Sequence, residues 1–178
     1  MAEEKKEPWL NYLALSTVIF AVCATFSTFK GGGFSTRSVM SQSQAANQWA
    51  YYQAKSLKSN LYEIQKEVFE LELKESNDTR STPVTEAHKE LIRDFSEKIA
   101  RYDAEKAQIQ EDAKQLEAAR DDAQLHAQIF GFAVIFLQIA ILLSSIAALM
   151  KNKGIWYLSL LVGTGGLIYV ANGFLLFF

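Results

Sequence analysis

The chain has 178 residues, a formal net charge of -2 and a hydrophobic content of 49%, and its mean hydropathy of +0.00 resembles that of a soluble domain. That average hides a strong segregation, because Asp, Glu, Lys and Arg are absent from 8–29, 123–150 and 154–178. Each stretch is longer than the roughly 20 apolar residues with which a helix crosses a bilayer. The composition excludes a soluble enzyme domain, and the lack of net positive charge excludes a nucleic-acid binder.

The first charge-free stretch predicts a transmembrane helix over 9–29, which follows a tail, residues 1–8, that carries Lys5 and Lys6. The apolar run is long for a cleaved signal peptide, the tail also carries glutamates, and no clear small-x-small site comes before Lys30. We therefore expect a retained signal anchor. The single cysteine, Cys23, lies inside it and is interpreted as a small apolar helix residue.

Three consecutive glycines, Gly31 to Gly33, predict a flexible break over 30–37, because glycine weakens a helix. The next helix is expected over 38–75, and its apolar residues alternate at spacings of four and three, as in a coiled coil. The residues predicted to form this seam are Ala50, Ala54, Leu57, Leu61, Ile64, Val68 and Leu71. The same register extends backwards through Asn47 and Ser43.

A polar, turn-rich segment predicts the tip of a hairpin over 76–83, with Thr82 as the cap of the following helix and Pro83 in its first turn. That helix is expected over 84–127 and to continue without a break into a second transmembrane helix, 128–150. Its seam is predicted to contain Ile92, Phe95, Ile99, Tyr102, Lys106, Ile109, Ala113, Leu116, Arg120, Ala123 and Ala127.

A short turn over 151–154 separates this helix from a third transmembrane helix, 155–178. The predicted fold is therefore an all-α integral membrane protein with three transmembrane helices. A long extramembrane antiparallel coiled-coil hairpin connects the first and second of them. Lys5, Lys6, Lys151 and Lys153 fall on one side of this topology, so that the positive-inside rule predicts a cytoplasmic amino terminus and a hairpin on the opposite side.

Small residues at helical spacing are the informative feature of helices in lipid, because they allow close backbone approach. The third span has Ser159, Gly163, Gly166 and Gly173 on one face, and the other two spans have similar faces. Three small faces favour association of several copies into a homo-oligomer. The alternative is packing within one chain.

The neutral stretch 38–54 offers a second candidate interface. Asn47 lies on the predicted seam, where a single polar residue specifies register. Two alternatives remain open: the stretch lines a vestibule above a pore, or its aromatic residues lie at the membrane surface. The candidate interface or vestibule residues here are Asn47, Gln48, Trp49, Tyr52 and Gln53.

No catalytic, cofactor-binding or metal-binding residues are predicted. His126 lies one helical turn after Asp122, but a metal site normally needs three or four ligands, and His126 is interpreted as a polar interface residue. No phosphate loop, nucleophile elbow or Ser/His/Asp set is present. The spans also lack Asp, Glu, Lys and Arg, which argues against a coupled pump but allows a passive pore.

Two runs of sequence carry a resemblance. Trp9-Leu10-Asn11-Tyr12-Leu13-Ala14-Leu15-Ser16-Thr17 and Asn47-Gln48-Trp49-Ala50-Tyr51-Tyr52-Gln53-Ala54-Lys55-Ser56 resemble an uncharacterised bacterial membrane family, domain of unknown function 4337. The resemblance implies a protein of the bacterial inner membrane, with the hairpin in the periplasm. It implies no activity and no catalytic residues.

These patterns predict a non-enzymatic, homo-oligomeric membrane protein whose projecting hairpin acts as a scaffold or interaction surface. Its expected partners are the lipid bilayer, further copies of itself and an unidentified protein at the hairpin, and no nucleic acid. One alternative is an oligomeric channel with a neutral polar vestibule. Another is an accessory subunit of a larger membrane complex.

Overall fold

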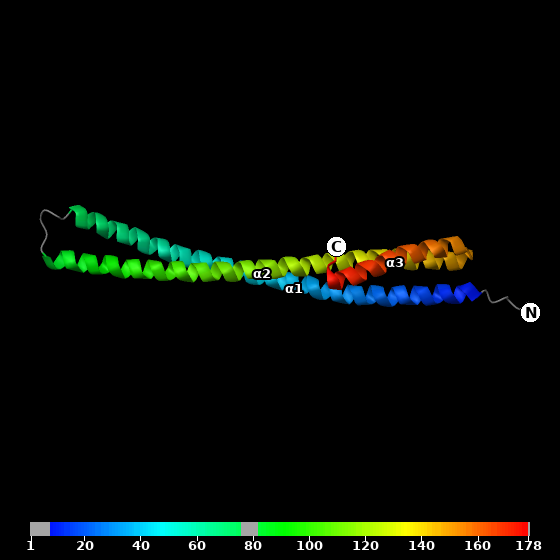
Figure 1. Ribbon diagram of the computed structural model, residues 1–178. Coiled ribbons are helices and arrows are strands. Elements are labelled where there is room, and N and C mark those ends of the chain that lie inside the picture. The colour runs from blue at the N-terminus through cyan, green and yellow to red at the C-terminus, as the bar shows by residue number, and fades with distance from the viewer. Residues whose placement is uncertain (1–7, 76–81, 178) are drawn as a thin grey trace, which may run out of the picture. The chain divides into compact units, whose positions relative to one another are not determined.

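The structure of the protein is a computed structural model, which describes residues 8–75 and 82–177 and, within them, all side chains except those of 82–84. These residues form three helices, α1 (Pro8–Glu75), α2 (Thr82–Met150) and α3 (Lys153–Leu175), which Figure 1 shows as coiled ribbons. No strand occurs in the described ranges. The prediction of an all-helical fold with three helices is therefore confirmed.

Contacts divide the chain into two compact units. The first, here called the three-helix unit, combines residues up to Met40 with residues from Ala119 onwards. The second, here called the two-helix unit, comprises Ser41–Ala118. Helices α1 and α2 contribute residues to both units, whereas α3 belongs to the three-helix unit.

The predicted break over 30–37 is wrong, because α1 is one helix from Pro8 to Glu75. Each glycine costs a helix about 1 kcal/mol relative to alanine, so a reason for the continuity is needed. Tertiary packing supplies one: a Cβ atom on Gly31 would lie 3.0 Å from the Cβ atom of Phe130 in α2. The glycine lets α1 approach α2 closely, and the contact stabilises the helix where its own propensity is weak.

Helix α2 is also continuous, as predicted, and its 69 residues correspond to about 100 Å of helix. It begins at Thr82, two residues before the predicted start. The remainder of the predicted tip, 76–81, and the capping roles of Thr82 and Pro83 lie outside the residues and side chains that the structure describes.

The connection between α2 and α3 is shorter than the predicted 151–154. Lys151 has a positive φ of 47°, and α3 already begins at Lys153. Asn152 is its N-cap, since the side-chain oxygen accepts a hydrogen bond of 2.8 Å from the backbone N–H of Gly154. Helix α3 also ends at Leu175, before the predicted 178, because Leu176 adopts a left-handed conformation and its N–H bonds to the carbonyl of Asn172.

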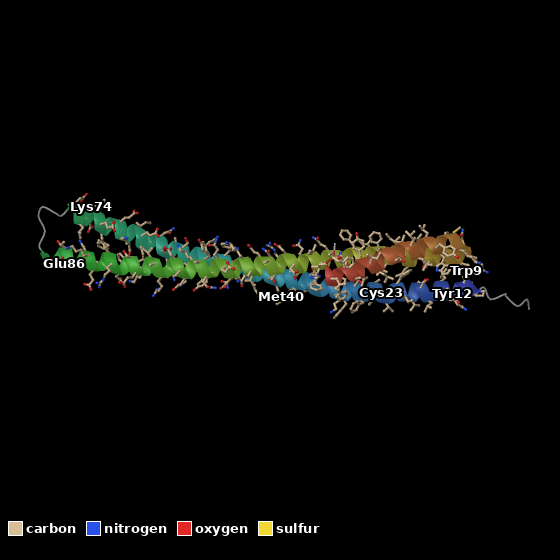
Figure 2. All side chains as sticks on the ribbon, in the orientation of Figure 1. Trp9, Tyr12, Cys23, Met40, Lys74 and Glu86 are labelled. Carbon is tan, nitrogen blue, oxygen red and sulfur yellow. The ribbon has the colours of Figure 1, made fainter. Side chains whose placement is uncertain are left out.

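Within the three-helix unit, α1 runs parallel to α3 and antiparallel to α2. The rings of Trp9 and Trp156 lie 6.0 Å apart near the start of both α1 and α3, and those of Phe26 and Phe174 lie 5.9 Å apart near the end of α3. Figure 2 labels Trp9 and Cys23 along this part of α1. The core combines two fully buried large side chains, Phe130 and Leu137, with many alanines.

The two-helix unit is an antiparallel hairpin. Contacts pair successively later residues of α1 with successively earlier residues of α2: Trp49 with Glu117, Ser59 with Asp103, Tyr62 with Phe95 and Phe69 with His88. The predicted seam of α2 is confirmed, because Phe95, Tyr102, Ile109 and Ala113 are all buried. The hairpin part of the fold therefore has the predicted direction.

The predicted seam of α1 is wrong. Its aliphatic residues from Leu57 to Leu71 are exposed, and α1 instead turns a set of residues offset by two positions toward α2. Residues two apart lie on nearly opposite faces of a helix. The observed seam is polar and aromatic, and its buried or half-buried members are Gln48, Tyr52, Lys55, Ser59, Tyr62, Lys66 and Phe69. Four of them, Lys55, Ser59, Tyr62 and Phe69, have hydrogen-bond or ring partners on α2.

All three helices contain a segment long and apolar enough to cross a membrane. The most apolar windows of α1, α2 and α3 have mean hydropathies of 1.8, 2.5 and 1.6. This property concerns length and composition, and it agrees with the charge-free stretches of the sequence. The fold is consistent with a multi-pass membrane protein.

Candidate interaction surfaces

The small residues of α3 pack inside the chain. A Cβ atom on Gly163 would lie 2.2 Å from the ring of Phe20, one on Gly166 would lie 2.8 Å from Leu137, and one on Gly173 would lie 2.9 Å from Phe130. Each glycine therefore accommodates a large side chain of α1 or α2. The expectation that Ser159, Gly163, Gly166 and Gly173 face another copy is corrected, because their own chain covers them.

A hydrogen bond joins α2 and α3 in the same core. The Oγ atoms of Ser144 and Ser159 lie 2.7 Å apart, and both residues are fully buried. Either hydroxyl can donate to the other, so that the pair satisfies two polar groups at once. Small residues thus allow close approach here, and a polar contact fixes the position of the helices.

The candidate residues of 38–54 are divided between two faces of α1. Asn47 and Gln53 are exposed, as an interface or vestibule role requires. Gln48, Trp49 and Tyr52 are half-buried against α2 instead. The indole Nε1 of Trp49 donates a hydrogen bond of 2.8 Å to the carboxylate of Glu117, and Tyr52 packs edge-on against the Trp49 ring at 5.6 Å. Trp49 therefore connects α1 to α2, and Tyr52 supports its ring.

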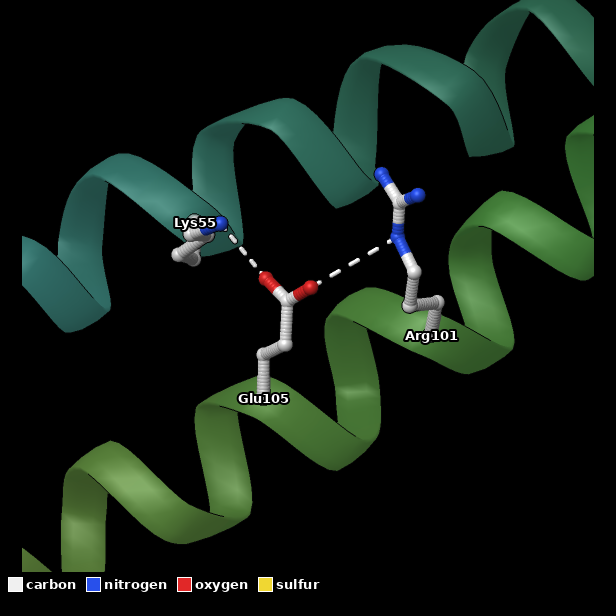
Figure 3. A network of polar contacts seen from close by, with 3 residues as sticks. All are labelled: Lys55, Arg101 and Glu105. Carbon is white, nitrogen blue, oxygen red and sulfur yellow. Dashed lines mark hydrogen bonds and ion pairs between the residues drawn. The ribbon is translucent and has the colours of Figure 1, made fainter.

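Charged groups reinforce the hairpin one turn further along. Glu105 of α2 accepts from the Lys55 ammonium at 2.5 Å and from Arg101 at 3.5 Å (Figure 3). The hydrogen bond with Glu105 raises the pKa of Lys55, and the same bond lowers the pKa of Glu105. Lys55 also lies over the ring of Tyr102 at 5.1 Å. The group has the geometry of a structural cross-link between helices.

A second ionic contact lies on α2 itself. The Lys106 ammonium lies 2.7 Å from the carboxylate of Asp103, which raises the pKa of Lys106. The hydroxyl of Ser59 on α1 donates to the same carboxylate at 3.4 Å. Ser59 is fully buried and therefore gains a partner for its only polar group.

His126 joins α2 to the end of α3 in the three-helix unit. Its Nδ1 atom lies 2.7 Å from the carbonyl oxygen of Gly173, its ring stacks on Phe34 at a centroid distance of 4.5 Å, and its Nε2 atom lies 3.8 Å from the carboxylate of Asp122. Among the described residues, no group of three or more His, Cys, Asp and Glu side chains is placed to hold a metal ion. No sequence pattern predicts the contact with Gly173, because the partner is a backbone atom 47 residues away.

An open groove of about 660 Å³ lies between α1 and α2 in the three-helix unit. Its walls are neutral and consist mostly of small or amide side chains. They include Ser27, Thr28, Gly31, Gly32, Ser35, Gln124 and Gln128. The lining contains no Asp, Glu, Lys or Arg.

Five exposed aliphatic residues of α1 lie on one face of this helix in the two-helix unit. They are here called the aliphatic stripe and comprise Leu57, Leu61, Ile64, Val68 and Leu71, with 47% to 63% of each residue exposed. The heptad pattern predicts that these residues form a seam, but α2 does not cover them. Their burial in the hairpin was expected because α2 is the nearest helix in the chain.

Comparison with known proteins gives one match. The model of the family described as Domain of unknown function (DUF4337) matches residues 9–176. No curated protein matches the chain, and no solved structure does so.

Proposed function

From the premise that the chain belongs to the DUF4337 family, whose description names no activity, we propose that the protein is a non-enzymatic homo-oligomeric membrane scaffold. In this proposal the three-helix unit lies in the bilayer, and the two-helix unit projects from it as an interaction surface. A bacterial inner membrane is the proposed location.

One observation carries the membrane assignment: the three-helix unit has polar residues inside and large apolar residues outside. Ser27, Ser144, Ser159 and Asn172 are fully buried. The outward-facing side chains include Val22, Phe29, Ile135, Leu142, Leu161 and Leu175. Water would penalise such a surface, whereas lipid solvates it. The buried hydroxyls are satisfied within the unit, as for Ser27, whose Oγ donates to the carbonyl of Cys23 at 2.8 Å.

Alkaline extraction of membranes from cells that express the full chain tests this assignment. We expect the protein to stay in the pellet, as integral proteins do. Recovery in the soluble fraction would contradict the membrane assignment. A reporter fused after Phe178 then tests sidedness, for which the proposed topology places the carboxyl end on the same side as the hairpin.

The oligomeric part of the proposal is supported by the exposed apolar residues of the two-helix unit, which lipid does not cover if the hairpin projects into water. Native mass spectrometry in mild detergent tests it. We expect assemblies of two or more copies of the 20.0 kDa chain. A spectrum with monomer alone, across several detergents, would overturn the oligomeric scaffold.

The neutral groove favours a second candidate, an oligomeric channel. Its Ser, Thr and Gln lining has no Asp, Glu, Lys or Arg, as expected for a passive pathway rather than a pump. Planar-bilayer recordings of the purified protein test this candidate. Conductance that disappears in a Gly32→Leu variant would favour the channel over the scaffold, because Gly32 lines the groove and a Cβ atom there meets no other atom within 4 Å. Silence under voltage and tension would exclude it.

A further inference from the structure

The aliphatic stripe lacks a partner in the described part of the two-helix unit. Helix α2 packs on the other face of α1, against Tyr52, Ser59, Tyr62 and neighbouring residues. Single exposed leucines are ordinary on protein surfaces. Five large aliphatic side chains on one face of one helix are a contiguous apolar surface, which marks a contact.

The spacing of the residues in the aliphatic stripe indicates that a helix covers the stripe. From Leu57 to Leu71 the intervals are four, three, four and three, which is the a and d pattern of the coiled-coil heptad. Counted in the same register, Leu61 and Val68 occupy a positions, while Leu57, Ile64 and Leu71 occupy d positions. A period of 3.5 keeps the stripe in line with one partner helix along its length. A flat or globular surface does not require this period.

We propose that the aliphatic stripe of α1 packs against the same stripe of a second copy of this chain, as a parallel coiled coil. This inference rests on the proposed homo-oligomeric function and names the surface through which the copies associate. The coiled coil is parallel because copies in one bilayer share one orientation. A self-complementary surface of this kind closes a symmetric assembly without another protein.

The second copy is the partner that the chemistry of the unit favours. Among the described residues of Ser41–Ala118, large exposed hydrophobic side chains occur at Tyr51 and in the stripe on α1, but on α2 only at Leu91. The outer face of α2 instead exposes charged residues, including Glu90, Arg93, Glu97, Arg101, Glu111 and Lys114. Helix α2 of another copy therefore offers no apolar face to the stripe, whereas α1 of another copy offers a matching one.

The residues that flank the stripe are compatible with this pairing. In a parallel coiled coil, Gln53 comes opposite Lys58 of the second copy and Asn60 comes opposite Gln65, without repulsion. Glu67 comes opposite Glu72, which is unfavourable, but exposed charge pairs contribute little compared with burial of five aliphatic side chains from each copy. Asn47 lies exposed at an a position of the same register, where its amide can pair with its equivalent and fix the alignment.

Lipid fits the aliphatic stripe less well than a second copy of the chain does. Charged residues surround the stripe on the same segment of α1, and Lys58 and Glu67 flank it directly. Insertion of the stripe into a bilayer would carry these groups toward the hydrocarbon, at a high free-energy cost.

Cysteine cross-linking in native membranes tests the proposal. In a Cys23→Ala background, single variants Leu57→Cys, Ile64→Cys and Leu71→Cys place a thiol at three d positions, and Glu63→Cys, also exposed on α1, is the matched control. Oxidation should give a species of twice the 20.0 kDa chain mass. We expect about fivefold more of it from each d-position variant than from Glu63→Cys, because a disulfide needs Cα atoms within about 7 Å. Two differently tagged copies in one cell should appear together in the product.

The cross-linked products also distinguish the proposed pairing from an antiparallel pair and from another protein, and a fluorescence measurement distinguishes it from lipid. Cross-linking of Ile64→Cys alone, with Leu57→Cys bonding to Leu71→Cys when the two are co-expressed, would show an antiparallel pair and overturn the parallel arrangement. A product of another mass that lacks the second tag would overturn the proposal in favour of a different protein. Quenching of a fluorophore at Ile64→Cys by lipid-phase quenchers would overturn it in favour of the bilayer.

Native mass spectrometry of a Leu61→Lys/Ile64→Lys variant separates this inference from the proposed function. We expect a loss of oligomer of about tenfold or more, because four or more charges would enter a paired seam. The control Glu63→Lys, at an exposed position of α1 outside the proposed pairing, should keep the assembly, and far-UV circular dichroism should show equal helix content for both variants. If the stripe variant stays fully oligomeric, the stripe is not the contact, although the homo-oligomeric function stands. If the unsubstituted chain is monomeric, the proposed function fails as well.

Discussion

The two units use the same two helices but different packing chemistry. In the three-helix unit, glycine, alanine and serine bring backbones close, and large rings fill the spaces opposite them. In the two-helix unit, tyrosines, a tryptophan and ion pairs connect α1 to α2. If the three-helix unit lies in lipid and the two-helix unit in water, as proposed, this difference has a physical reason. Lipid provides no hydrophobic drive between helices, so close contact must stabilise the first unit, whereas water allows aromatic burial to stabilise the second. Along α1 and α2, packing thus changes from small residues in the unit proposed to lie in lipid to aromatic and ionic contacts in the unit proposed to lie in water.

The largest loss of stability should come from replacement of Phe130, whose ring lies in the core of the three-helix unit. Phe130 is fully buried and meets Gly31, Phe34 and Gly173. Replacement by alanine should lower the free energy of unfolding by about 3–5 kcal/mol, because the cavity forfeits these contacts. Thermal unfolding in detergent, followed by near-UV circular dichroism, measures it. Phe132→Ala, at an exposed phenylalanine two residues away, should cost far less; equal losses would mean that close packing does not stabilise this unit.

Adding a methyl group should distinguish two glycines of α3. Gly163→Ala forces a Cβ atom against the ring of Phe20, which is itself buried and has little room to move. We expect a loss of about 1–3 kcal/mol in unfolding free energy. Gly165→Ala meets no atom within 4 Å and should be neutral or stabilising. If both variants have the same stability, the close approach of α1 and α3 is contradicted.

In the two-helix unit, Trp49→Phe tests the hydrogen bond between Trp49 and Glu117. The variant keeps an aromatic ring but removes the Nε1 donor that bonds to Glu117. Because the pair is only half-buried, we expect the unit to lose about 1 kcal/mol, measured by urea unfolding of the full chain. Glu117→Gln retains an oxygen acceptor and should cost less. A larger loss in Glu117→Gln than in Trp49→Phe would show that Glu117 acts through another contact.

The buried hydroxyl pair should show a smaller effect with a specific non-additivity. Ser144→Ala leaves Ser159 without its 2.7 Å partner and should cost about 0.6 kcal/mol. The double variant, in which both serines become alanine, should recover part of this loss because no polar group then remains unpaired. Ser145→Ala, whose hydroxyl bonds to the carbonyl of its own helix, is the control. Strictly additive losses in a double-mutant cycle would argue against the pair.

The smallest change in stability is expected in acid, from an ion pair of the two-helix unit. Hydrogen bonding to Lys55 lowers the pKa of Glu105 from its usual 4.5. The stabilisation is therefore present above pH 4.5 and is lost as the pH falls through the lowered value. Unfolding curves between about pH 2 and pH 6 should show a shallower decline for Glu105→Gln than for the unsubstituted chain. Identical pH dependence would show that the pair contributes nothing measurable.

Much of the fold was accessible from the sequence. The charge-free stretches predicted three long apolar helices, and the uninterrupted apolar pattern of 84–150 predicted one continuous α2. The seam of α2 was also predicted, because its most apolar positions are the ones that its neighbour covers. In these cases one physical cause, apolar patterning, determines the result by itself.

The errors arose where two causes compete. Gly31–Gly33 favour a break by propensity, but the contact between Gly31 and Phe130 favours continuity, and the sequence does not show that α2 lies there. The Leu57–Leu71 pattern identifies a face that needs covering, although not the helix that covers it. Glycines 163, 166 and 173 signalled close packing, but their partners were large rings and a leucine of the same chain rather than another copy.

The connection at Lys151 and Asn152 has a consequence for biosynthesis. Only two residues separate α2 from α3, and the second of them, Asn152, is the N-cap of α3. With so short a connection, α2 and α3 cannot separate or change orientation independently unless a helix end unwinds. If the three-helix unit lies in the bilayer, as proposed, we expect the apolar end of α2 to remain incompletely integrated until α3 has been synthesised, so that both enter as one helical hairpin.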